Sequence, residues 1–116
     1  MRGTETKGGA WSKAGEATIT DYFSSGAVWY KENADMIIVI LKDLTLNKST
    51  AGAGSVEFAT GLPQPDGSYV FLLTDYQGAR TMRCTYKMDG KLYIHYTGTI
   101  APSDIQFYGQ VIAFKR

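Results

Sequence analysis

The fold of this chain is decided by the stretch Met36-Ile37-Ile38-Val39-Ile40-Leu41, an unbroken apolar run. The run is far too short to cross a bilayer as a helix, which takes roughly 20 residues. Its central side chains branch at Cβ, which makes them stiff and suits them to a pleated sheet. Because neighbouring side chains in a strand point to opposite faces, an apolar residue at every position indicates a strand covered on both sides.

One face of this strand can lie on the chain's own core, and the other face needs a second covering layer. A domain of 116 residues has little material for that layer, so we expect a neighbouring copy to provide it. Ile37, Val39 and Leu41 share one face and are the expected oligomer-interface residues. These residues, or parts of the last strand, should be buried only in the assembly. On this view, a Val39→Asp change would give monomer or aggregate.

The composition indicates one all-β domain. A chain of this length can bury a stable core without metals or disulfides. Thirteen glycines and eight tyrosines are typical of strands joined by turns. The net charge of +1 is spread along the chain and does not indicate a nucleic-acid surface. The N-terminus lacks the apolar core of a signal peptide, and we expect no membrane insertion.

Residues 1–16 are glycine-rich and polar, and we expect a flexible lead-in or linker there. Residues 17–116 form the expected β-sandwich domain. A bulge near Lys42-Asp43 would return Leu44 and Leu46 to the buried face. About eight strands joined by short turns indicate an antiparallel, jelly-roll-like sandwich, with a closed up-and-down barrel as the rival architecture. The strands are predicted over residues 17–23, 27–31, 36–46, 55–59, 69–74, 79–88, 91–97 and 105–114.

The clearest hairpin joins residues 79–88 to residues 91–97. A two-residue turn would mix polar and apolar side chains on each face, whereas a three-residue loop, Met88-Asp89-Gly90, keeps them apart. The longer loop also places Gly90 at the position that needs a left-handed conformation. The expected pairs are Tyr86 with Leu92, Cys84 with Ile94, and Met82 with Tyr96. The expected outward residues are Arg83, Thr85, Lys87, Tyr93 and His95.

We find no catalytic, metal-binding or cofactor-binding pattern in the sequence, and we expect a binding protein that is not an enzyme. Cys84, the single cysteine, is interpreted as a small buried hydrophobic residue. His95, the single histidine, is interpreted as a surface residue. Asp66 and Asp75 lie in neighbouring loops, where acids usually form turns rather than a glycosidase pair.

A candidate ligand-binding turn contains Asp75, Tyr76 and Gln77, with Arg80 just beyond it. An exposed aromatic ring beside planar polar groups suits a saccharide. The ring can stack on the apolar face of the sugar while the polar groups bind pairs of hydroxyls. The same residues also suit an ordinary turn. Trp29-Tyr30 is a second candidate, and these two aromatics equally suit a core or an interface.

Four segments follow one another along the chain: Gly26-Ala27-Val28-Trp29-Tyr30-Lys31, Leu44-Thr45-Leu46-Asn47, Ala59-Thr60-Gly61-Leu62-Pro63-Gln64-Pro65 and Gly90-Lys91-Leu92-Tyr93-Ile94. From about Ala27 onward, this order of segments resembles the distal domain of bacteriophage tail-fibre and receptor-binding proteins. In such proteins a Gly-Leu-Pro segment follows a strand and precedes a loop. The resemblance implies a homotrimeric β-sandwich at the tip of a virion fibre, which recognises a host cell-surface saccharide (a glycan) without cleaving it and without a cofactor. It transfers no individual binding residue, because the loops of the family vary where contact is made.

Three other functions fit the same pattern. The chain could be a structural virion module that acts in assembly without a ligand. It could be a small β-barrel that holds an apolar ligand inside, as lipocalins do. It could also be a carbohydrate-binding module of a secreted bacterial enzyme. The assembly mass and a glycan-binding measurement would separate these functions.

Overall fold

The protein is an all-β domain in the computed structural model, which describes residues 13–76, 80–98 and 105–116. These residues form nine strands and no helix. The prediction of an all-β antiparallel fold is confirmed, with nine strands in place of the eight or so expected. The strands are β1 (Lys13–Glu16), β2 (Thr18–Ile19), β3 (Phe23–Glu32), β4 (Met36–Leu46), β5 (Ala53–Thr60), β6 (Tyr69–Asp75), β7 (Thr81–Tyr86), β8 (Leu92–Thr97) and β9 (Gln106–Phe114).

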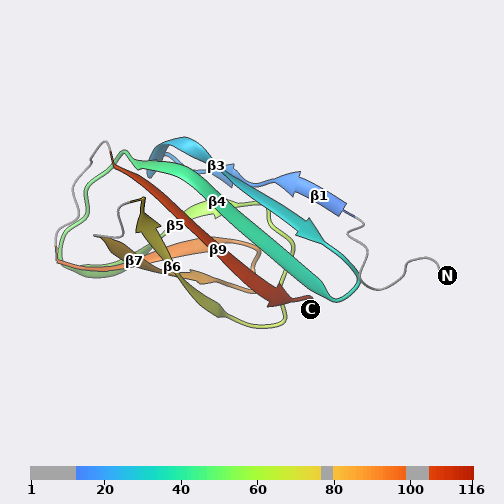
Figure 1. Cartoon of the computed structure of the whole chain (residues 1–116). Helices are drawn as coiled ribbons and strands as arrows, with labels where there is room; N and C mark the ends of the chain where they lie inside the picture. Colours follow the sequence, from blue (N-terminus) through green and yellow to red (C-terminus); the bar gives the residue numbers. More distant parts are fainter. Residues whose placement is uncertain (1–12, 77–79, 99–104) are drawn as a thin grey trace.

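The nine strands form one sheet with the order β1-β3-β4-β9-β6-β7-β8-β5-β2. The sheet folds over on itself into a nearly closed, barrel-like sandwich, in which β3, β4 and β9 lie across β5, β6 and β7 (Figure 1). β1 pairs with β3 and β2 pairs with β5. Between them, the Ala17 amide donates to the Val28 carbonyl (2.8 Å). The segment from β1 to β2 therefore supplies the strands at both edges of the sheet.

The strand connections make a Greek key rather than an up-and-down barrel. β6, β7 and β8 follow one another as a meander, and β9 returns to lie beside β6. This is the 4-1-2-3 order that most sandwiches contain. β9 also pairs with β4, so residues that are far apart in the sequence lie together on the outer surface of these strands.

The central strand and its bulge are confirmed. β4 spans the predicted residues, and its register with β9 shifts between Leu41 and Leu44. Asp43 takes a left-handed backbone conformation with φ of 57°. Beyond the bulge, Leu44 and Leu46 are 0% and 5% exposed, so the extra residue returns them to the core as predicted.

The predicted interface residues of β4 lie in the chain's own core, which corrects the expectation that only an assembly buries them. Ile37, Val39 and Leu41 are 0%, 0% and 1% exposed in the single chain. The folded-over sheet supplies the covering layer itself, with residues such as Phe58 of β5 and Ile94 of β8. It is the other face of β4, carrying Met36, Ile38 and Ile40, that points outward and is only half-buried.

The β7–β8 hairpin has the predicted register, with Tyr86 opposite Leu92 and Cys84 opposite Ile94. The Gly90 amide donates to the Lys87 carbonyl (3.0 Å), and Gly90 has φ of 76°. The three-residue loop is therefore confirmed.

Several predicted boundaries near the start of the domain are wrong. Residues 13–16, predicted as part of a flexible lead-in, form β1, while residues 1–12 lie outside the described part of the chain. Gly15 fits in β1 because the Tyr30 ring lies over it, and a Cβ there would come 2.7 Å from the Tyr30 hydroxyl. The predicted turn at residues 24–26 is instead part of β3, where the register with β4 shifts twice. The turn predicted at residues 100–104 also lies outside the described residues.

Candidate functional site

A row of large apolar side chains lies on the outer surface of β3, β4 and β9. Trp29, Ile112 and Phe114 expose 48%, 53% and 57% of their surface. Members of this row face one another across neighbouring strands. The pairs are Trp29 with Ile40, Ile38 with Ile112, and Met36 with Phe114. We call this set the outer apolar face; its members are Trp29, Met36, Ile38, Ile40, Ile112 and Phe114.

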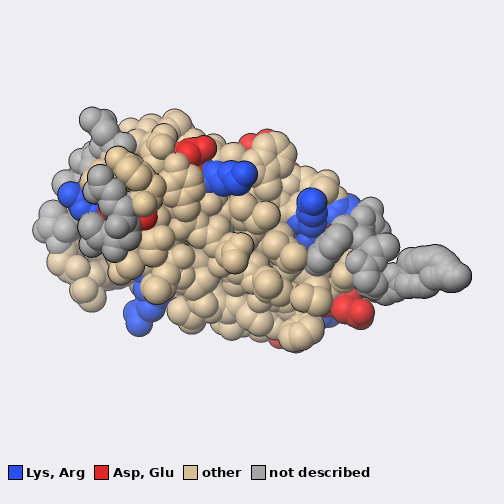
Figure 2. Space-filling view, viewed as in Figure 1, with Lys and Arg blue, Asp and Glu red and all other residues tan. Residues whose placement is uncertain are grey.

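Charged side chains are sparse around the outer apolar face. In the view of Figure 2 uncharged residues cover the centre of the surface, and Lys, Arg, Asp and Glu stand apart from one another. On β6, the neighbour of β9, Val70 and Leu72 are also exposed, at 66% and 54%. Contiguous apolar surface of this kind on a monomer usually marks a contact site.

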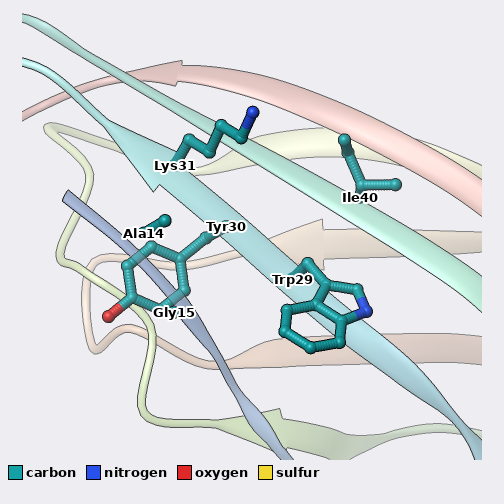
Figure 3. A pocket seen from close by; sticks show the side chains of 6 residues that line it. All are labelled: Ala14, Gly15, Trp29, Tyr30, Lys31 and Ile40. Carbon is teal, nitrogen blue, oxygen red and sulfur yellow. The ribbon is translucent and has the colours of Figure 1, made fainter. Parts of the chain in front are cut away.

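A pocket of about 330 Å³ opens beside the outer apolar face, where β1 meets β3 (Figure 3). Ala14 of β1 contributes only a methyl group to the lining, and Gly15 contributes backbone. Trp29 and Ile40 give the pocket apolar walls, and among the described residues that line it Lys31 alone is charged. The pocket is lined by Ala14, Gly15, Trp29, Tyr30, Lys31 and Ile40. Trp29 therefore belongs to a surface feature rather than to the core.

The predicted ligand-binding turn is only partly open to solvent. Tyr76 is 69% exposed and Arg80 is also exposed, whereas Asp75 is only 3% exposed. Asp75 ends β6 opposite the buried Phe107, and its amide donates to the Arg80 carbonyl (3.2 Å). Gln77 lies outside the described residues. Asp75 therefore cannot bind the hydroxyls of an external ligand as predicted, because its side chain is enclosed.

A second polar and aromatic cluster, which sequence reasoning missed, lies close to Tyr76. The Tyr108 hydroxyl of β9 donates to Asp43 Oδ1 (2.5 Å), which lies on the bulge of β4. The same hydroxyl lies 3.3 Å from Gln106 Oε1. The bond to Asp43 raises the pKa of Tyr108, and the Tyr76 phenol adds to that effect. Asp43 and Tyr108 are 65 residues apart, so only the pairing of β9 with β4 brings them together.

The predicted outward face of the β7–β8 hairpin is largely confirmed, although Thr85 is 7% exposed. The Thr85 hydroxyl lies 2.5 Å from His95 Nε2. Burial, and then the positive charges of Arg83 and Lys87, lower the pKa of His95 below its ordinary value of 6.5. Lys87 also lies over the Tyr93 ring, 4.4 Å from its centroid.

We expect an NMR titration of His95, the single histidine, to give a midpoint below pH 6.5. In an Arg83→Gln variant the pKa of His95 should be lowered less, since one nearby positive charge is removed. Because the fold favours the neutral ring, the stability from this group is fully present above pH 6.5 and is lost as the pH falls through the lowered pKa. A midpoint at or above pH 6.5 in the wild type would contradict the effect of burial and of the two positive charges on His95.

The single cysteine does not have the setting of a reactive thiol. Cys84 is 0% exposed, and burial raises its pKa, so the thiolate is disfavoured. The interpretation of Cys84 as a buried hydrophobic residue is confirmed. Within residues 13–76, 80–98 and 105–116, no group of three or more His, Cys, Asp or Glu side chains could hold a metal ion. In the same residues, no helix has the length and apolar character needed to cross a membrane.

No known protein-family model matches the chain, and a search of curated proteins finds no significantly similar sequence. The two features that remain as candidates for function are the outer apolar face with its pocket, and the cluster around Asp43 and Tyr108.

Proposed function

We propose that this chain is the distal domain of a bacteriophage tail fibre or receptor-binding protein. In this proposal it acts in the virion as a homotrimer and recognises a host cell-surface saccharide without cleaving it. The observation that carries the proposal is the outer apolar face, which a single copy leaves exposed. A second copy covers such a face well, because the net charge of +1 gives little repulsion between copies.

The arrangement of the outer apolar face is compatible with a closed ring of three copies. The pocket beside Trp29 lies at the β1–β3 side, while Ile112 and Phe114 protrude from β9. A cyclic trimer joins unlike patches of neighbouring copies, so protruding side chains of one copy can enter the pocket of the next. Buried aromatic anchors seated in pockets are the contacts that usually dominate an interface.

The Gly-Leu-Pro segment of the resemblance gives further support. Gly61 follows β5, and Leu62 is 7% exposed, with its amide donating to the Gly90 carbonyl (3.1 Å). The Tyr86 hydroxyl donates to the Pro63 carbonyl. The segment thus follows a strand and leads into a loop, as it does in the family that the chain resembles.

The alternative of an apolar ligand held inside the barrel has less support. The inward positions are occupied by large side chains with relative exposure below 2%, including Tyr86, Phe58 and Leu92. The alternative of a virion assembly module without a ligand shares the proposed interface, and only a saccharide-binding measurement separates it from our proposal.

Light scattering on the eluted protein should give a trimer mass for the wild type. An Ile112→Asp variant should elute as a monomer with a native circular dichroism spectrum, because the new charge opposes burial in the interface. Met88→Asp is the matched control, since Met88 is 48% exposed on the β7–β8 loop and is not part of the outer apolar face. A monomeric wild type, or an Ile112→Asp variant that keeps the full assembly mass, would count against the proposed interface.

A further inference from the structure

In the cluster around Asp43 and Tyr108, the Tyr108 hydroxyl has more hydrogen-bond acceptors within reach than its single proton can satisfy. The Tyr108 hydroxyl has one proton, and both Asp43 Oδ1 (2.5 Å) and Gln106 Oε1 (3.3 Å) lie within its reach. The short bond to Asp43 takes that proton. Gln106 Oε1 and the second oxygen of the exposed Asp43 carboxylate are therefore open to donors from outside the chain.

The bulge in β4 aims Asp43 outward at this position. Asp43 has φ of 57°, which is uncommon for a residue other than glycine, and both Lys42 and Asp43 are exposed. Bulges often redirect a side chain near a functional site, and strained residues gather at such sites. The left-handed conformation goes with an exposed Asp43 carboxylate. In a regular strand, residue 43 would share the inward face of Val39 and Leu41.

An exposed aromatic ring stands beside these acceptors. β6 and β9 pair Thr74 with Tyr108 and Asp75 with Phe107, and Tyr76 directly follows the last of these pairs. Tyr76 is 69% exposed, and its phenol acts electrostatically on Tyr108. The ring thus borders the acceptor group and offers a flat apolar surface.

We propose that Asp43, Gln106 and Tyr108, with the Tyr76 ring beside them, bind a pair of hydroxyls on a neutral saccharide. Hydroxyl groups supply the missing donors, and a sugar's apolar face can rest on the Tyr76 ring. Among the described residues no cation lies within ion-pair distance of Asp43, so its charge disfavours phosphorylated or carboxylated sugars. This inference rests on the proposed attachment function and assigns its site and ligand class.

A purely structural role is the rival explanation, because the described part of the chain contains two more Tyr–Asp pairs. Tyr93 donates to Asp89 (2.5 Å) and Tyr69 donates to Asp66 (2.5 Å), each within a few residues of sequence. In each of these local pairs, a loop aspartate accepts a hydrogen bond from a tyrosine of the following strand. Tyr93→Phe is therefore a matched control that removes the same type of bond away from the proposed site.

The test is binding of the full chain to an array of bacterial cell-surface saccharides, both neutral and acidic. We expect the wild type to bind neutral saccharides. Asp43→Asn, Tyr108→Phe and Tyr76→Ala should each weaken that binding by about tenfold or more, while Tyr93→Phe leaves it unchanged. Asp43→Asn keeps an acceptor for Tyr108, so its thermal melt should stay close to that of the wild type.

The outcomes separate the two proposals. If the wild type binds but Asp43→Asn and Tyr108→Phe bind equally well, the site is overturned and the attachment function stands. If the wild type binds only acidic saccharides, the ligand class assigned here is overturned. If the wild type binds neither the array nor the surface of bacterial cells, the attachment function itself fails and the site fails with it.

Discussion

A Val39→Asp variant is expected to lose its fold and not merely its assembly state. Val39 is 0% exposed in the single chain and lies between Tyr30 of β3 and Val111 of β9. A carboxylate at this position would be dehydrated without a partner, at a cost of at least about 4 kcal/mol. The lost burial of the valine side chain adds about 1.5–3 kcal/mol. The total is comparable with the lower end of the stability of a small domain, about 5–15 kcal/mol, so the folded state should be lost or become marginal. Circular dichroism and urea unfolding measure the effect.

Ile38→Asp is the matched control, because it makes a similar change one residue away on the opposite face of β4. Ile38 is half-buried and pairs with Lys31 and Ile112 on the outer surface, so the new carboxylate can reach water. This variant should keep a native spectrum and unfold cooperatively, with a loss below about 2 kcal/mol, while failing to assemble. Equal loss of structure in the two variants would show that the inward and outward faces of β4 are assigned wrongly.

The parts of the fold that could be predicted are those with local signals. The bulge follows from the charged pair that interrupts the apolar run before Leu44, and the β7–β8 loop follows from the need for a left-handed residue at Gly90. Both are properties of a few consecutive residues. The orientation of β4 had no such signal, because both of its faces are apolar and period-2 alternation does not say which one is inside.

The candidate site could not be predicted for a related reason. Asp75 suits a turn, but whether its side chain is inside depends on its pairing with Phe107 of β9. The contact between Asp43 and Tyr108 likewise depends on β9 lying beside β4. Alternation along β9 does group Tyr108 with Ile112 and Phe114 on one face, and the sequence does predict the bulge near Lys42-Asp43. Long-range strand order was the missing information, since many orders satisfy the same local patterns.

A Gly26→Ala variant is expected to lose about 3 kcal/mol or more of unfolding free energy. Gly26 has φ of 111°, a conformation that residues with a side chain rarely adopt. A Cβ at this position would also lie 2.6 Å from the Asp43 carbonyl oxygen and 2.8 Å from Leu44 Cα. These are backbone atoms of the bulge in β4, so relief of the overlap must move that strand. The loss is measured as the change in urea midpoint at constant m-value.

Gly52→Ala separates the two causes, because Gly52 has φ of 82° but a Cβ added there would meet no described atom within 4 Å. It should lose only about 1–2 kcal/mol, the cost of the backbone conformation alone. The excess loss in Gly26→Ala then measures how tightly β3 and β4 are packed at the bulge. Because the overlapped oxygen belongs to Asp43, the same variant should weaken saccharide binding even at temperatures where it remains folded. Equal losses in the two variants would mean that the bulge can yield, and that Gly26 is required only for its backbone conformation.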